Sequence, residues 1–383
     1  MKFSIESIAL KAALTRLGNV VQNNSKIPVL HCVHIEATDN KIELRACDCD
    51  QFVSVIFEAD VKTNGFTVLP FKQFKSACET AYADRAKLTV QVDDKTANLT
   101  MDGDMPFSWS FAVQDFEDYP SFPDVETGRA SFSVTDIQKL LGNVAFAMSN
   151  EPTRYYLNGA YLHLENSDLI AVATDGHKLA IQRIQFPPET DTNQFTTSGQ
   201  NTSGIIPKKA VSFILKNLPK NGSNEPVMLS WNQHYLKFEA PNFVLYTKLV
   251  DGTFPDYTRI IPKEDFTTKV QLDRSVILRA ISAFLKYGDK KEATDIRINP
   301  TSLDLKKRCV EHGEIFCRIA GVTQGKDIEI CFNTSYLAQI LKALHSDKIS
   351  LSIESDHSPA RLTNHNDDSY LCVVMPMRSK GVW

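Results

Sequence analysis

Asp175 and His177 are the residues of this chain whose types and spacing come nearest to catalytic chemistry. They stand two apart in the segment 173–178, and a carboxylate beside an imidazole can act as an acid–base pair or hold a metal ion. An earlier segment offers a different interpretation. Asp48 occupies the matching place after a strand of the same pattern, and the residue two positions further on is another aspartate. We therefore interpret both Asp48 and Asp175 as turn formers that accept hydrogen bonds from their own backbone.

The chain carries none of the short motifs that usually accompany catalysis or metal binding. It has no Gly-x-Ser-x-Gly elbow, no glycine-rich phosphate loop and no His-Glu-x-x-His helix. The 8 cysteines are scattered, with no Cys-x-x-Cys pair: Cys32, Cys47, Cys49, Cys78, Cys309, Cys317, Cys331 and Cys372. We expect reduced, packed thiols, and we expect no catalytic residue, no metal site and no cofactor.

Size and charge set the broad class. A chain of 383 residues that is 43% hydrophobic is long enough for two or three domains. The net charge of −4 excludes a polycation, so any contact with nucleic acid must come from local patches. The segment 1–6 has an acidic residue where a secretion signal would be apolar, and no run is long enough to span a bilayer. We expect a soluble, cytoplasmic protein without a membrane partner.

The elements that carry these residues repeat three times. A short strand leads into an amphipathic helix at three places: Phe3 into 8–21, Phe132 into 137–148, and Val270 into 276–287. Apolar residues recur in each helix at steps of three and four, which buries one face. The starts lie 129 residues apart from Phe3 to Phe132 and 138 apart from Phe132 to Val270, so the loops vary in length while the order of elements is kept.

Other elements recur with the same order. A second helix is expected after strands at Pro70, Pro207 and Asn333, where proline or a capping Asn suits a helix start. The alternating segments 42–48 and 169–175 also match, and a Phe-Pro-Asp element closes the first two units. The polar segment 187–204 is expected to be a mobile loop inside the second unit. We conclude that the chain holds three copies of one α+β domain.

Basic residues recur on the expected helices. They are Lys11, Arg16, Lys72, Lys75, Lys139, Lys208, Lys209, Lys216, Arg274, Arg279, Lys286 and Lys342. Taken one helix at a time, they are ordinary solvated faces. If all six helices face one way, the same residues add up to a lane for phosphates, which bind by charge without a reading of base sequence.

Four segments carry a resemblance to a known family: 154–159, 173–180, 248–257 and 373–378. Together with the opening Met-Lys-Phe and the segment 27–30, they resemble the signature segments of the β subunit of bacterial DNA polymerase III, a sliding clamp. The resemblance runs the whole length of the chain. It implies a non-enzymatic, head-to-tail homodimer that closes into a ring, with helices lining the hole and sheets outside.

The resemblance also implies domain boundaries and partners. We expect clamp domains at 1–128, 129–258 and 259–383, each with two helices packed on antiparallel sheets. The expected partners are double-stranded DNA, bound without regard to sequence, and the replicative polymerase, the clamp loader and repair proteins, bound through short peptides. A clamp-like paralogue that serves plasmid, phage or repair synthesis is the alternative that the sequence leaves open.

Site residues follow from the resemblance position by position. The peptide cleft between the second and third domains would comprise Leu157, Thr174, Gly176, His177, Lys178, Leu179, Pro255, Arg259, Ile260, Asn333, Tyr336, Val373, Val374, Met375, Pro376, Met377 and Arg378. DNA contacts would include Lys26, Lys72, Tyr155, Tyr156, Lys208 and Lys209. The dimer interface would use Phe107 and Trp109 from the first domain and Phe284 and Leu285 from the third, although all four could instead be core residues.

Several positions depart from the family pattern. Asn24 stands where family members can carry a basic residue, and Glu151 adds a negative charge to the loop before Arg154. The segment 290–294 lacks an aromatic found in some members. The chain also continues past Arg378 into a tail, 379–383, that ends in Trp383. This tail is either a disordered end or an arm that affects peptide binding in the cleft.

Overall fold

The computed structural model of the chain describes residues 1–22, 25–81, 86–103, 105–114, 117, 119–125, 128–188, 190, 192–197, 200–201, 203–220, 223–288, 293–309 and 313–378. The first repeat consists of β1 Lys2–Glu6, α1 Ser7–Leu17, η1 Pro28–His31, β2 Cys32–Thr38, β3 Lys41–Cys47, β4 Gln51–Glu58, β5 Asp60–Thr63, β6 Gly65–Pro70, α2 Phe71–Thr80, β7 Lys87–Val92, β8 Thr96–Met101 and β9 Phe107–Ala112. The second consists of β10 Arg129–Ser133, α3 Val134–Ala145, η2 Pro152–Leu157, β11 Gly159–Glu165, β12 Asp168–Thr174, β13 Lys178–Gln185, η3 Thr192–Phe195, β14 Thr196–Thr197, β15 Gln200–Asn201, β16 Gly204–Pro207, α4 Lys208–Asn217, β17 Pro226–Trp231, β18 Tyr235–Ala240, β19 Phe243–Lys248 and η4 Tyr257–Ile260.

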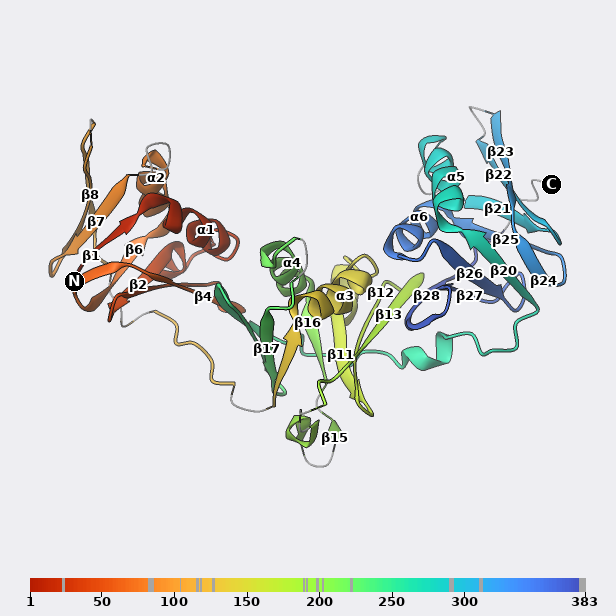
Figure 1. Cartoon of the computed structure of the whole chain (residues 1–383), viewed down its shortest axis with the longest axis horizontal. Coiled ribbons are helices and arrows are strands. Elements are labelled where there is room, and N and C mark those ends of the chain that lie inside the picture. Colours follow the sequence, from red (N-terminus) through yellow and green to blue (C-terminus); the bar gives the residue numbers. More distant parts are fainter. Residues whose placement is uncertain are drawn as a thin grey trace. The chain divides into compact units, whose positions relative to one another are not determined.

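The third repeat keeps the same order of strands and helices. It consists of β20 Thr268–Asp273, α5 Arg274–Lys286, β21 Ala293–Ile298, β22 Ser302–Cys309, β23 Gly313–Ala320, β24 Val322–Gly325, β25 Ile328–Asn333, α6 Thr334–Ala343, β26 Lys348–Ile353, β27 Ala360–Asn364 and β28 Asp367–Val374. The predicted threefold α+β repeat is therefore confirmed, and Figure 1 labels the α-helices and many of the strands.

Local chemistry explains where the second helix of each repeat begins. Asn333 caps α6, because its side chain accepts hydrogen bonds from the backbone N–H groups of Ser335 and Tyr336 at 2.9 and 3.2 Å. Pro70 and Pro207 are the last residues of β6 and β16, one position before their helices begin. The sequence therefore placed these helix starts correctly, although the prolines precede the helix and do not occupy its first turn.

Backbone pairing across repeat boundaries decides the sheet architecture. Strand β4 of the first repeat pairs antiparallel with β19 of the second, with Val53 opposite Leu245. Strand β13 of the second repeat pairs in the same way with β28 of the third, with Leu179 opposite Val373. The results are an eight-stranded sheet, β10-β17-β18-β19-β4-β3-β2-β6, and a nine-stranded sheet, β16-β11-β12-β13-β28-β27-β26-β20-β24.

The strands of the middle repeat are thus divided between these two large sheets, apart from β14 and β15, which pair with each other. The chain accordingly forms two compact units, one of 1–134, 187–202 and 216–249, the other of 135–186, 203–215 and 250–383. Each unit also holds a smaller sheet, β5-β1-β7-β8-β9 in the first and β23-β22-β21-β25 in the second. Each compact unit contains one of the two large sheets, so the limits of the units differ from the limits of the repeats. The domain limits at 128 and 258 stay a prediction.

A buried polar network ties the helical layer of the second unit to its sheet. The Asn143 side chain on α3 donates to Gln182 Oε1 on β13 at 2.7 Å, and its Oδ1 lies 2.8 Å from Nε2 of His345. The Tyr370 hydroxyl on β28 donates to the Asn143 carbonyl at 2.9 Å. Since β13 and β28 come from different repeats, this network satisfies buried polar groups on both sides of the ladder between them.

The segment 187–204 differs from the prediction of a polar mobile loop. Within its described part, η3 places Phe195 in the core of the first unit, where its ring stacks on Trp231 with centroids 4.3 Å apart. Gly128 gives this ring room, because a Cβ there would collide with it. The prediction overlooked one aromatic side chain, whose burial is enough to anchor a polar segment.

The buried ring of His34 predicts a pH-dependent stability for the first unit. Its ring on β2 is 2% exposed and lies between Phe66 and Tyr119, with centroids 6.2 and 5.5 Å away. Burial, assisted by the positive charge of Arg45 and opposed by Glu43, lowers the pKa of His34 from 6.5 to about 4. The unfolded chain therefore binds a proton at a higher pH than the folded chain does.

We expect the free energy of unfolding to fall as the pH is lowered from 6.5 to about 4, and to fall less in His34→Phe, which cannot take up that proton. Urea unfolding at several pH values, with hydrogen exchange of the β2 and β3 amides as the probe, measures how the free energy of unfolding of each protein depends on pH. Equal slopes for the two proteins would contradict the assignment.

Candidate partner-binding and nucleic-acid sites

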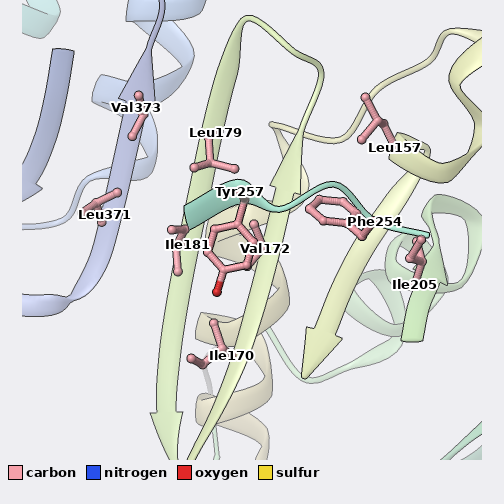
Figure 2. Close-up of a cluster of buried hydrophobic side chains, with 10 residues drawn as sticks. All are labelled: Leu157, Ile170, Val172, Leu179, Ile181, Ile205, Phe254, Tyr257, Leu371 and Val373. Carbon is pink, nitrogen blue, oxygen red and sulfur yellow. The ribbon is translucent and has the colours of Figure 1, made fainter. Parts of the chain in front are cut away.

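An apolar cluster forms where β13 and β28 meet in the second unit. Strand residues from β12, β13, β16 and β28 point to one face of the sheet, and Figure 2 shows their side chains converging there. The cluster consists of Leu157, Ile170, Val172, Leu179, Ile181, Ile205, Phe254, Tyr257, Leu371 and Val373. Three predicted cleft residues, Leu157, Leu179 and Val373, are therefore brought together, at 4%, 1% and 2% exposure.

The segment between β19 and β20 covers this cluster. Phe254 stacks on Tyr161 with centroids 4.8 Å apart, and the Tyr257 hydroxyl lies 2.8 Å from Nε2 of His163. Burial raises the pKa of Tyr257 to about 12 and lowers the pKa of His163, so both stay neutral at neutral pH. We call residues 250–266 the strap. The repeated Phe-Pro-Asp element of the strap is visible in the sequence, but Phe254 and Tyr257 are not among the predicted site residues.

The turn between β12 and β13 presents His177. The Asp175 carboxylate accepts hydrogen bonds from the backbone N–H groups of His177 and Lys178 at 2.9 and 3.0 Å, and it pairs with the Lys178 ammonium. Gly176 has φ of +87°, a conformation that glycine adopts without strain. Asp175 is thus held by its own turn and by a buried lysine, as the turn-former interpretation predicted.

Beyond the buried cluster lies a surface that we call the partner patch. It comprises Gly176, His177, Pro255, Arg259, Ile260, Asn333, Tyr336, Met375, Pro376, Met377 and Arg378. The His177 ring stacks on Tyr336 with centroids 5.8 Å apart, and the Met375 N–H donates to the His177 carbonyl at 2.9 Å. The Lys178 ammonium lies 4.6 Å from the centre of the Tyr336 ring. The two stacked rings, which we call the platform of the patch, therefore contact the buried ion pair of Lys178 and Asp175.

The partner patch exposes both apolar and charged side chains. Ile260, Met375 and Met377 are each about two-fifths exposed, at 40%, 38% and 40%. Arg259 pairs with Asp256 at 2.8 Å, yet its side chain remains 83% exposed. Unbranched methionines adapt to ligands of different shape, and an exposed guanidinium can hold a carboxylate or a carbonyl.

The remaining predicted cleft residues support this surface from below. Thr174, Lys178 and Val374 are buried at 4%, 5% and 0% exposure. The Thr174 hydroxyl donates to the Lys178 carbonyl at 2.7 Å and accepts from the Gly176 N–H at 3.0 Å, which closes the turn. The structure therefore places all seventeen residues in the second unit, six in its interior and eleven at its surface.

Two of the predicted interface residues stand on a sheet edge. Phe107 and Trp109 lie on β9, the last strand of the five-stranded sheet, and their rings stack 5.4 Å apart. Phe107 is 40% exposed. Phe284 differs: it is 1% exposed and packs in the core under α5, so for this side chain the alternative of a core residue is the correct one. Its neighbour Leu285 is half-buried.

The predicted DNA-contact residues occur in both units. In the first unit, Lys26 and Lys72 are exposed. In the second, Lys208 donates to the Asn150 side chain at 2.6 Å, and partial burial lowers its pKa, while Lys209 is exposed. Tyr155 is 53% exposed on η2.

Tyr156, the neighbour of Tyr155 on η2, packs partly against the apolar cluster. This short helix therefore borders both the predicted DNA-contact site and the predicted cleft.

Some of the positions that depart from the family pattern lie within the described residues, and others do not. Glu151 pairs with Arg154 at 3.4 Å, which offsets its charge locally. Asn24, residues 290–292 and the tail 379–383 with Trp383 lie outside the described residues. Within the described part of the chain, no group of three or more His, Cys, Asp or Glu side chains could hold a metal ion. No described helix is long and apolar enough to cross a membrane.

Comparisons with known proteins agree with this architecture. Three models of the DNA polymerase III beta subunit match in order, the N-terminal domain at residues 1–123, the central domain at 132–256 and the C-terminal domain at 258–378. The beta sliding clamps of Haemophilus influenzae and Vibrio cholerae are 29% and 28% identical, over 99% of this chain and 100% of theirs.

Solved structures give the same result. A sliding clamp from Bartonella birtlesii bound to griselimycin matches with a TM-score of 0.88 at 26% identity, over 99% of this chain and 100% of that one. One from Pseudomonas aeruginosa, also bound to griselimycin, matches with a TM-score of 0.89 at 24% identity and the same coverage. The fold defines a three-domain clamp protein. The chain belongs to the family of the DNA polymerase III beta subunit.

Replacing Asp175 tests the role of the turn. Asp175→Asn keeps an oxygen that accepts the two backbone hydrogen bonds but removes the charge that pairs with Lys178, whose side chain is 5% exposed. Breaking a buried ion pair costs about 3 kcal/mol, and we expect a loss of that order in the stability of the second unit, measured by urea unfolding.

Asp48→Asn is the matched control. Asp48 accepts from the backbone of Asp50 and Gln51 at 3.0 and 2.6 Å, and Gln51 stands where the second repeat has its lysine. This change should therefore cost less. An equal loss in both variants would show that the turn, and not the ion pair, sets the stability.

Proposed function

We propose that this protein is a DNA sliding clamp, which encircles duplex DNA and tethers a replicative polymerase to it through the partner patch. The observation that carries the proposal is the threefold repeat, which matches the three domain models of one clamp family in order. The protein has a processivity role and performs no chemistry of its own. Asp175 and His177, the pair nearest to a catalytic one, serve the turn and the platform of the patch.

A rule of strand pairing supports a closed, head-to-tail dimer. In each repeat the last long strand, β9, β19 or β28, occupies the same place in the element order, and so does the strand β4, β13 or β23. Inside the chain, β19 pairs with β4 and β28 pairs with β13. Their remaining equivalents, β9 and β23, each end a sheet. A third junction of the same kind therefore requires β9 of one protomer and β23 of another.

Closure with two protomers satisfies both open edges at once. Exposed sheet edges invite pairing with another chain, and a heterologous contact that closes forms a ring. Phe107 on β9 and Phe316 on β23 are exposed, at 40% and 52%, and would be covered in such a junction. The two ladders of a dimer would then use the pairing mode that already joins the repeats.

Contacts with DNA would be made by charge alone. Exposed lysines stand on helices of all three repeats, among them Lys72, Lys209 and Lys342. Lysines that meet phosphates bind any base sequence and release counterions, so binding weakens steeply as salt is raised. This accounts for DNA contact in a protein whose net charge is −4.

The dimer prediction rests on Trp109. We expect Trp109→Ala to dissociate the protein at low micromolar concentration, because an aromatic at an interface core commonly contributes about 2 to 4 kcal/mol. Light scattering across a dilution series measures the change. Phe66→Ala, which removes another exposed aromatic of the first unit, at 55% exposure, should leave the dimer intact. A dimer unaffected by Trp109→Ala would exclude this edge.

Retention on circular DNA tests the ring itself. Protein loaded by a clamp loader onto nicked circular DNA should remain bound after gel filtration and should be lost when the circle is cut once. A protein that binds a particular site would stay on the linear DNA and so contradict the proposal. The double change of Lys208 and Lys209 to Glu should reduce loading or retention several-fold without altering the dimer.

A further inference from the structure

A second recognition zone adjoins the apolar cluster on the same face of the nine-stranded sheet. A pocket of about 260 Å³ lies at the strands β20, β24, β26 and β27, which are labelled in Figure 1. Its lining consists of Glu264, Phe266, Lys269, Val270, Gln271, Val322, Gln324, Ser350, Ser352, Arg361 and Thr363. None of these residues belongs to the partner patch.

Strand register shows that the pocket and the cluster share a face. Directly paired residues point to the same side of a sheet. One row of partners crosses the sheet without a break: Leu179, Val373, Arg361, Ser352, Lys269 and Gln324. The row begins in the apolar cluster with Leu179 and Val373 and ends in the pocket. The strap makes a second connection, because Ile261 packs against the cluster while Phe266 lines the pocket.

The chemistry of the pocket is cationic and aromatic. The Lys269 ammonium and the Arg361 guanidinium lie 5.4 and 6.0 Å from the centre of the Phe266 ring. The Arg361 side chain is only 19% exposed, and its ion pair with Asp368 is 4.0 Å long, to a carboxylate that is fully exposed. Glu264 supplies one negative charge to the lining. A mostly buried guanidinium with so distant a partner can bind a closer carboxylate by donating two parallel hydrogen bonds to it.

Size and position restrict the ligand. A volume of about 260 Å³ is below the range usual for sites that enclose a whole cofactor, and it suits one or two side chains. Neighbouring strands lie about 5 Å apart, so the middle of the pocket is about 10 Å from Val373, which lies two residues before Met375 of the partner patch. An extended peptide of roughly three or four residues covers such a distance. An apolar residue in the partner patch and an acidic residue about three positions away could therefore be held by one segment.

We infer that this pocket binds acidic side chains that flank the apolar residues of a partner peptide, and so selects among the partners of the patch. The inference rests on the proposed partner site, since the pocket is to be reached from the patch. The charge of Lys269 and Arg361 supplies affinity for carboxylates, while Phe266 holds the two cations in place. Val322, which is 66% exposed, gives the flanking segment an apolar contact at the rim.

The test uses the full-length dimer and fluorescent peptides with a Leu/Phe core. Each core carries, on one side or the other, a spacer of two to four residues and then a pair of Glu or a pair of Gln. Fluorescence anisotropy gives the Kd at low and high salt. We expect one Glu peptide to bind about 5-fold more tightly than its Gln counterpart at low salt, and this gain to disappear at high salt.

Variants of the pocket residues show whether the tighter binding of the Glu peptide depends on the pocket. Lys269→Gln and Arg361→Gln should each reduce it while the core peptide keeps its Kd, and either variant is informative if the other fails to fold. Lys348→Gln, an exposed lysine of β26 outside the pocket lining, should keep the gain. Equal binding of Glu and Gln peptides would overturn the inference. So would a gain that survives in both pocket variants but is lost in Arg259→Gln.

Griselimycin separates this inference from the proposed function. Related clamps have been solved bound to griselimycin, so competition between griselimycin and the core peptide would support the proposed ligand-binding function of this clamp. Displacement of the core peptide without any advantage of Glu over Gln overturns the pocket alone. A core peptide that does not bind at all overturns both the proposed partner site and the pocket.

Discussion

The pairing of β4 with β19 and of β13 with β28 is the constraint on which the rest of this structure depends. An unpaired strand edge leaves backbone N–H and C=O groups without partners and invites uncontrolled association. By pairing the edge of each repeat with the next repeat, the chain turns three small domains into two extended sheets. The same rule leaves one edge at each end of the repeat series, β9 and β23. In this way one pairing mode accounts for both the internal architecture and the proposed association of protomers.

Sheet continuity also brings together the residues of the proposed partner site. Because β13 and β28 are adjacent, residues nearly two hundred positions apart, such as Leu179 and Val373, become direct neighbours. The strap crosses the face that they create and buries Phe254 and Tyr257 against it. The polar network of Asn143, Gln182 and Tyr370 holds the other face of the same junction. A ligand on the proposed patch would therefore meet a surface fixed from both sides, which would limit the ordering cost of binding.

Sequence predicted the repeating features and missed those that depend on long-range register. Helix starts and the Asp175 turn are local, so periodicity and capping residues were enough to find them. Phe284 continues the apolar positions of Ile277 and Ile281 on α5, so helical periodicity alone indicates its burial. The burial of Phe195 depends instead on a partner brought by folding, Trp231, and no local pattern signals it. The pocket was missed for the same reason. Lys269, Phe266 and Arg361 come from segments about ninety residues apart, and only the ladders from β20 to β27 bring them together.

Divergence between the first two repeats distinguishes the second junction, where the proposed partner site lies, from the first. Both junctions have an apolar cluster covered by a Phe-Pro-Asp element, with Phe122 packed at 5.4 Å from Phe52 in the first unit. The turns differ. Cys49 adopts a φ of +72° where the second repeat has Gly176. Residues other than glycine rarely adopt that backbone conformation without cost.

The residues after the turns differ as well. Asp50 and Gln51 stand in the first repeat where the second has His177 and Lys178. Of these two turns, only the second therefore carries an imidazole, that of His177, which stacks on Tyr336. Lys178 supports this stack, because it pairs with Asp175 and also lies over the Tyr336 ring. Changes at three consecutive positions of a shared turn thus gave one junction a rigid aromatic platform, while the pairing of the strands beneath it stayed the same.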